Sequence, residues 1–268
     1  MIKRELLRPG ALVALLILLI VLVWAVFPGL FTGFDPISGS AKEALKPPSA
    51  LHWFGTDATG RDLYARVVHG ARHSLSAGAA AVGIGFVVGT LLGVIAGARP
   101  GIVDDIIMRL VDVLLAIPGL LLSLSVVILL GFGTTNAAIA VGLTSIATFA
   151  RLARSRVVSV SASDFVEAAY GSGGTFWSVL GRHVLPNSMG PVIALIALQF
   201  GSAILQIATL GFLGYGAPPP TPEWGLLIAE GRNYMATGWW LTTLPGLVVV
   251  AVVLATNRLS NAIREVTR

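Results

Sequence analysis

The stretch "SDFVEAAYGSGGTFWSVLGRHVLPN", Ser163 to Asn187, interrupts a chain otherwise dominated by Leu, Val, Ile, Ala and Gly. Its polar and small residues predict two short helices with a glycine-rich hinge between them. We expect Asp164 to cap the first helix, with Glu167 as the acidic partner in its first turn. A helix of about two turns is unstable alone, so it should dock onto another surface.

The second helix of this stretch is expected to begin at Thr175 and to end at Pro186, because proline interrupts a helix. One side of it carries only large apolar side chains, those of Phe176, Val179, Leu180 and Val184. A plainer alternative is that the whole stretch is a hairpin that only connects two membrane spans.

The rest of the chain has the composition of a membrane protein. Of its 268 residues 55% are apolar and only 12% are charged, and the mean hydropathy is +0.85. Soluble domains carry about 25% charged residues. We predict an all-α, polytopic membrane protein with six transmembrane helices, and we expect Pro118 to kink the third. The predicted spans are 11–27, 75–97, 105–130, 137–157, 189–213 and 239–255.

The distribution of positive charge predicts which side each segment faces. With the N-terminus in the cytoplasm, 12 Lys and Arg residues fall in cytoplasmic segments and 6 outside. This bias favours cytoplasmic N- and C-termini in the cell membrane. The predicted segments are a cytoplasmic N-terminus (1–10), a first anchor (11–31), an extracytoplasmic segment (32–74), a five-helix core (75–258) with a cytoplasmic loop (160–187), and a cytoplasmic tail (259–268).

Several kinds of chemistry are absent from the sequence. The chain has no cysteine, and none of its three lysines follows a glycine, so it carries no P-loop for ATP. His69 and His73 have helical spacing for a metal, but no third ligand is evident and no metal site is expected. An intramembrane enzyme would need converging acids, and Asp112 is the one carboxylate well inside a predicted span. The charge balance of +5 does not indicate nucleic-acid binding, because the positives sort by membrane side.

The cytoplasmic stretch resembles a known family. Glu167-Ala168-Ala169, Gly173 and Leu185-Pro186 match the EAA loop of ABC-importer permeases, EAA-x3-G-x9-I-x-L-P, except that His183 stands at the Ile position. With histidine at this position, the sequence RHVLPN resembles that of the peptide-permease branch of the superfamily. The resemblance implies a type I ABC importer transmembrane domain whose short helix seats in a cytosolic ATPase.

The resemblance also implies a role for each residue of that short helix. Glu167 would make a polar contact to the ATPase, while Ala168 and Ala169 would permit close approach. Phe165 would be the apolar anchor and Gly173 the bend.

The extracytoplasmic stretch "HWFGTDATGRDLYARVVHGARHSL", His52 to Leu75, resembles the C-type permease subunit of oligopeptide, dipeptide and nickel importers. Asp57 and Asp62 are expected to cap turns or to pair with Arg61 and Arg66. The residues from Leu63 to Val67 are expected to begin an amphipathic helix at the membrane surface. This segment is either a docking surface for a binding protein or an internally bonded plug of the outer mouth.

Three further groups of residues are candidates for function. In "GYGAPPPTPEWGLLIAEGRNYM", Gly214 to Met235, Glu223 and Trp224 either contact the binding protein or form a rigid cap. Arg109 and Asp112, spaced i, i+3, are expected to neutralise each other, with gating as an alternative. One face of the fifth span carries polar side chains that line a pathway or bond across helices: Gln199, Gln206 and Thr209.

These observations predict one permease subunit, forming half of the translocation pathway of an ATP-driven importer for di- or oligopeptides. The expected partners are a second, B-type permease, two cytosolic ABC ATPase domains, an extracytoplasmic binding protein and membrane lipid. ATP and Mg would be held by the partner subunits, with no cofactor in this chain. The alternatives are an importer of the same architecture for nickel, glutathione or haem, and an ion-coupled secondary carrier.

Overall fold

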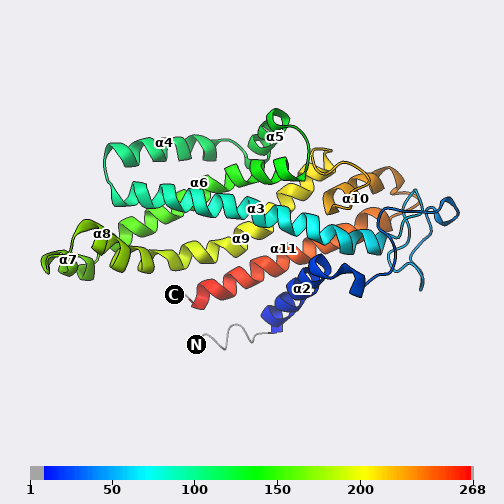
Figure 1. Ribbon diagram of the computed structural model, residues 1–268, viewed down its shortest axis with the longest axis horizontal. Coiled ribbons are helices and arrows are strands. Elements are labelled where there is room, and N and C mark those ends of the chain that lie inside the picture. Colours follow the sequence, from blue (N-terminus) through cyan, green and yellow to red (C-terminus); the bar gives the residue numbers. More distant parts are fainter. Residues whose placement is uncertain (1–8, 267–268) are drawn as a thin grey trace.

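The computed structural model describes the backbone of residues 9–266 and the side chains of residues 9–262. Long helices lie side by side and run from one end of the molecule to the other (Figure 1). The elements are α2 (Pro9–Val26), η1 (Pro28–Leu30), η2 (Ala41–Glu43), α3 (Leu63–Ala98), α4 (Ile102–Ala116), α5 (Gly119–Leu130), α6 (Thr134–Ser161), α7 (Asp164–Gly171), α8 (Phe176–Val179), η3 (Leu180–Val184), α9 (Leu185–Phe212), α10 (Trp224–Gly231), η4 (Arg232–Tyr234) and α11 (Trp240–Val266).

The two ends of the bundle carry different short elements. α7 and α8 project at one end, and α10 lies with the segment 27–62 at the other (Figure 1). We call these the α7 end and the α10 end. α2 begins and α11 ends on the side of the molecule nearer the α7 end, and Gly10 lies against the Arg258 side chain. The predictions made for residues 1–8 and 267–268 concern residues outside those that the structure describes.

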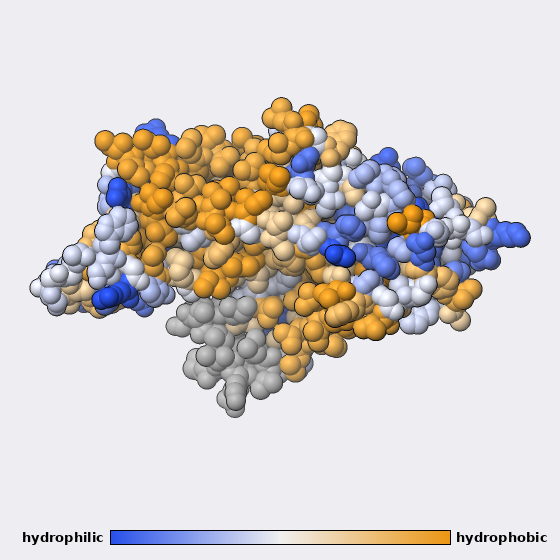
Figure 2. Space-filling view, viewed as in Figure 1, coloured by the Kyte–Doolittle hydropathy of each residue, from blue (hydrophilic) through white to orange (hydrophobic). Residues whose placement is uncertain are grey.

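Five helices are long and apolar enough to cross a bilayer, and α4 with α5 makes a sixth span if the bent pair counts as one. Hydrophobic surface covers the middle of the molecule, and hydrophilic surface gathers at the α10 end and around α7 (Figure 2). This is the pattern of a multi-pass membrane protein. The predicted fold class is therefore confirmed.

The third predicted span is broken rather than kinked. α4 and α5 meet at an angle of 96°. Ile117 is extended, with φ −89° and ψ 129°, because the ring of Pro118 disfavours helical geometry in the preceding residue. Pro118 thus lies where the sequence predicted a bend, but its effect is larger than a kink.

A glycine stripe on α3 lets α6 approach its backbone. The spacing of Gly85, Gly89, Gly93 and Gly97 places all four on one buried face. A side chain at Gly89 would collide with the carbonyl oxygen of Ile146, and one at Gly93 with that of Ala150. Small residues at this spacing form such close interfaces in membranes, so the stripe has a packing function.

The predicted helix limit at Pro186 is wrong. Pro186 does not end the helix after Thr175, because α8, η3 and α9 form one helix from Phe176 to Phe212. η3 is a turn of π-helix in which Leu185 N–H donates to the carbonyl of Leu180, and this wider turn precedes the proline. α11 continues to Val266, so most of the residues predicted as a cytoplasmic tail belong to this helix.

The predicted surface helix after Asp62 is also wrong. Leu63, Arg66 and Val67 are fully buried and form the first turns of α3. The face that the sequence assigned to the membrane surface is instead covered by other parts of the chain. Val67 and Trp224 belong to one apolar cluster, and Leu63 packs with Trp240 in another.

Candidate functional site

At the α7 end, the short helix is positioned by the residue before it. Ser163 is the N-cap, in extended geometry, and its carbonyl accepts from Val166 N–H (3.0 Å) and Glu167 N–H (3.2 Å). Asp164, predicted as the cap, is instead the first helical residue. Its carboxylate and that of Glu167 still lie in the first turn, where the helix dipole favours negative charge.

α7 is attached to the bundle through one buried side chain. Val166 is 1% exposed and packs in a cluster with Val157, Val179, Leu180 and Val184. The neighbouring Phe165 points away and is 48% exposed. Glu167 and Ala168 are exposed as well, and Ala169 is half-buried. The helix is therefore fixed from below while its outward side is left uncovered.

Gly173 turns the chain back after α7. Its φ of +88° lies in the left-handed region, which favours glycine, and its N–H donates to the Tyr170 carbonyl at 2.9 Å. The predicted bend is confirmed. The turn leaves a shallow, open groove lined by Phe165, Ala168, Ala169, Ser172, Gly173, Gly174 and His183. Leu185 is half-buried and Pro186 exposed just beyond it.

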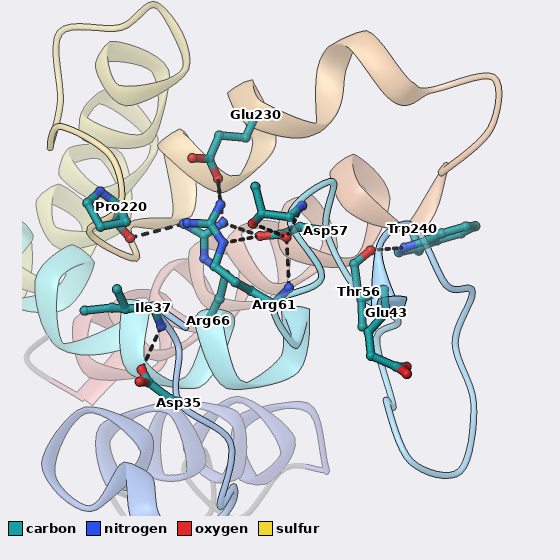
Figure 3. A network of polar contacts seen from close by, with 11 residues as sticks. Asp35, Ile37, Glu43, Thr56, Asp57, Arg61, Arg66, Pro220, Glu230 and Trp240 are labelled. Atoms are coloured by element: carbon teal, nitrogen blue, oxygen red, sulfur yellow. Dashed lines mark hydrogen bonds and ion pairs between the residues drawn. The ribbon is translucent and has the colours of Figure 1, made fainter. Parts of the chain in front are cut away.

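At the α10 end, Asp57 organises a network of ion pairs (Figure 3). Its carboxylate accepts from Arg61 Nε at 2.6 Å and from Arg66 Nη1 at 2.8 Å. The same carboxylate accepts from the backbone N–H groups of Thr59 and Arg61, which closes the turn. Burial acts to raise the pKa of Asp57, but these hydrogen bonds and the Arg61 charge outweigh it and lower the pKa.

Arg66 joins three segments of the chain. Its side chain is fully buried, and Nη1 also donates to Glu230 Oε2 at 2.6 Å. Nη2 donates to the Pro220 carbonyl at 3.3 Å. The pairing of Asp57 with Arg61 and Arg66 is as predicted. Glu230 was missed by the sequence reasoning, because no local spacing relates α10 to a residue far earlier in the chain.

Asp62 has the predicted capping role. It is the N-cap of α3 and accepts from Ala65 N–H at 2.6 Å. Asp62 Oδ2 also lies 2.8 Å from His52 Nδ1, within hydrogen-bond distance, and both side chains are buried. His52 was not singled out from the sequence, although it opens the recognised stretch.

Glu223 and Trp224 are buried, at 1% and 0% exposure. Glu223 caps α10 by accepting from the N–H groups of Gly225 (2.9 Å) and Leu226 (3.1 Å). Trp224 Nε1 donates to the Val67 carbonyl at 3.0 Å. Burial raises the pKa of Glu223 to about 7, and the two backbone hydrogen bonds lower it only in part.

These burials correct the docking prediction. A residue that contacts a binding protein must be reachable, and Asp57, Asp62, Arg66, Glu223 and Trp224 are covered by their own chain. The internally bonded plug and the rigid cap, the two alternatives, match the geometry.

The predicted pair of Arg109 and Asp112 is also corrected. Asp112 pairs with Arg151, and Asp104 is held by Arg154 at 2.5 and 2.6 Å. α6 packs beside α4 and supplies both arginines, so partners across the interface replace the one on the same helix.

The candidate pathway residues of α9 lie in different settings. Gln199 and Gln206 are half-buried, and Gln206 Oε1 has no hydrogen-bond partner among the described residues. Gly119, at the break between α4 and α5, lies against this oxygen. Thr209 donates to the Leu205 carbonyl of its own helix at 2.8 Å rather than across helices. A role for these three in a pathway stays a prediction.

Comparisons with known proteins agree with this architecture. Residues 89–266 match the family described as binding-protein-dependent transport system inner membrane component. The chain is 38% identical to the probable D,D-dipeptide transport system permease protein of Escherichia coli K12, over 96% of this chain and 86% of that one. It is 41% identical to the di/tripeptide transport system permease protein of Pseudomonas aeruginosa UCBPP-PA14, over 96% and 86%.

Two further proteins are similar. The glutathione transport system permease protein of Pectobacterium atrosepticum is 40% identical over 81% of this chain and 72% of that one. Among solved structures, the inward-facing MetNI methionine ABC transporter superposes with a TM-score of 0.62 at 18% identity, over 76% of this chain and 97% of that one. This structural likeness identifies the type I ABC importer fold.

Proposed function

The chain belongs to the family of binding-protein-dependent transport system inner membrane components, and from that premise we propose that it is the permease subunit of an ATP-driven peptide importer. Its relatives named above are permeases for dipeptides, di/tripeptides and glutathione. Short peptides are the cargo class that these names share, because glutathione is itself a small peptide. Nickel and haem find no support among these relatives.

The observation that carries the mechanism is the exposed side of α7. A short helix held by Val166 and Gly173, with Phe165 and Glu167 uncovered, is suited to enter a groove of a second protein. The chain has no Gly-Lys-Ser/Thr sequence, so the nucleotide must be bound elsewhere. We infer that α7 is the coupling helix that receives the motion of a cytosolic ATPase, which binds ATP and Mg.

This assignment sets the orientation. If α7 faces the cytoplasm, α10 and the segment 27–62 face outward, and both chain termini are cytoplasmic. The positive-charge bias supports the same orientation.

The assembly would contain a second, B-type permease, two ATPase domains and an extracytoplasmic binding protein. Closure of the ATPases would push the coupling helices together and shift the spans between two discrete packings. The rigid cap at the α10 end would keep its shape during this change, while the broken span α4–α5 offers a place for the pathway to open. The binding protein would then contact exposed residues near the cap rather than its buried network.

A charge reversal on α7 tests the function. We expect Glu167→Arg to lower ATP-dependent peptide uptake in proteoliposomes by at least about tenfold. Reversing the charge turns a favourable polar contact with the ATPase into a repulsive one, and this weakens the binding of the two proteins. The expected cause is loss of the ATPase subunits, measured by their co-purification. Asp105→Arg is the matched control, since Asp105 is an exposed acid in the first turn of α4.

The controls separate coupling from folding. The melting temperature of Glu167→Arg should equal that of the wild type, since this side chain is exposed. Normal uptake and normal co-purification of the ATPase by Glu167→Arg would contradict the assignment of α7.

A further inference from the structure

A large groove lies on the side of the bundle where α2 packs, away from α7 and from the buried network at the α10 end. Its volume is about 810 Å³. Four helices contribute to it: α2, α3, α9 and α11. The lining side chains are almost all apolar, and they include Leu22, Val26, Leu75, Ile196 and Phe200.

One charged residue lines this groove. Arg72 of α3 is exposed, and the described lining contains no carboxylate. Within residues 9–262, no acidic side chain lies within ion-pair distance of Arg72, in contrast to Arg66, Arg151 and Arg154. A cation at the rim of an apolar groove favours a ligand with an anionic head group and an apolar tail.

The position of Arg72 along the bundle gives the groove a direction. Arg72 lines it together with Val26, the last residue of α2, at the side nearer the α10 end. From there the lining follows α2 back to Leu18, a distance of about 12 Å at 1.5 Å per residue. On α3 it runs the same way, from Arg72 to Ala79. The charge therefore stands at the level where α2 leaves the membrane, and the apolar part extends into the hydrocarbon.

We propose that this groove binds an anionic phospholipid from the leaflet on the α10 side. One acyl chain lies between α2, α3 and α9, and the phosphate pairs with the guanidinium of Arg72. A bilayer surrounds these helices, so a lipid acyl chain fills the groove. The cation at its mouth, which pairs with no acid among residues 9–262, selects a lipid with net negative charge.

A helix from a second permease is the competing occupant. Such a helix would need an acidic residue at the level of Arg72 to match the charge. A phospholipid supplies this negative charge with its phosphate, and its acyl chain fills the apolar part of the groove.

Native mass spectrometry tests this proposal. The full chain, with the subunits that co-purify, is reconstituted in membranes with equal amounts of phosphatidylglycerol and phosphatidylcholine, and the lipids that remain bound are counted. We expect wild-type protein to retain phosphatidylglycerol preferentially. Arg72→Gln should lower the ratio of bound phosphatidylglycerol to phosphatidylcholine about fivefold, since one cation near the surface contributes about that factor. Arg232→Gln, at an exposed arginine of η4, should leave the ratio unchanged.

A second pair of variants tests the acyl-chain site without removing charge. Ala79 lines the groove and its exposed neighbour Ala80 does not. Ala79→Trp should fill the groove and abolish tight lipid retention, while Ala80→Trp should retain it. Equal retention of phosphatidylglycerol by wild type, Arg72→Gln and Ala79→Trp would overturn the proposal.

A thiol probe distinguishes the competing occupant. The chain has no cysteine, so Ala79→Cys is a unique label site. If added phosphatidylglycerol slows the reaction of this cysteine with a lipid-soluble maleimide, the result supports a bound lipid. Protection of this cysteine by the second permease in lipid-free detergent would show that a helix covers the groove, and would overturn the proposal.

Discussion

Polar residues are buried at one end of this molecule and exposed at the other. At the α10 end, Asp57, Arg66 and Glu223 are buried and bonded to their own chain. At the α7 end, Phe165 and Glu167 are exposed. The α10 end is bonded within its own chain, whereas the α7 end exposes the residues that we propose contact a second protein. Burial separates these two classes more clearly than residue type, because both ends carry acids and aromatics.

The strongest test of this contrast is Arg66→Met. We expect it to lower the free energy of unfolding by about 3–5 kcal/mol, because it removes the fully buried cation that pairs with Asp57 and Glu230 and leaves Arg61 alone beside both carboxylates. Thermal unfolding of the purified chain in detergent measures the loss. Arg232→Met, at an exposed arginine, is the control and should change little. If Arg66→Met melts like the wild type, the α10 end is not the self-contained cap described above.

Burial of the Glu223 carboxyl makes the stability of the α10 end depend on pH. Its pKa of about 7 exceeds the ordinary value of 4.5, so the folded state holds the proton more tightly than the unfolded state. The stability due to the neutral side chain is therefore complete below pH 4.5, declines as pH rises, and is lost above pH 7.

Glu223→Gln does not titrate and should remove this decline. Relative to the variant, the wild type should lose about 3 kcal/mol of stability between pH 4.5 and pH 7. Melting temperatures of both proteins across that range provide the measurement. A difference that stays constant with pH would mean that Glu223 ionises normally in the folded protein.

Two adjacent residues sharpen the contrast within α7 itself. Val166→Ala should lower stability by about 2 kcal/mol, because it leaves a cavity in the cluster under the helix. Phe165→Ala should leave the melting temperature unchanged but weaken ATPase association about tenfold, as expected for an aromatic anchor at an interface. Melting curves and co-purification of both variants give the comparison. Identical behaviour of the two would mean that α7 has no distinct inner and outer sides.

Much of the fold could be predicted because the bilayer imposes simple rules. Length and hydropathy located the spans, and the spacing of Gly85, Gly89, Gly93 and Gly97 is visible in the sequence and typical of the close helix contact that α6 makes. Local geometry was also accessible: Asp62 caps α3, and Gly173 makes the bend after α7. Each of these features depends on residues close together in the chain.

Several of the errors arose where a partner lies on another helix. Asp112 was matched with the nearest arginine, but α6 brings Arg151 beside it. For Glu223 and Trp224 the sequence left contact with a binding protein and a rigid cap as alternatives, and α10 folds back onto α3 and buries both. Glu230 gave no local signal at all. Such contacts depend on which helices are neighbours, and a single sequence does not state this.

The π turn at η3 has a mechanical consequence. It carries the chain through Pro186 without an interruption, so a single rod runs from Phe176 to Phe212. Gln206, beside the break of α4 and α5, stands about 45 Å along this rod from its start. The helix is continuous between these two points and contains Pro191. A tilt imposed at its α8 end would therefore displace Gln206 through a wider arc than it displaces α8.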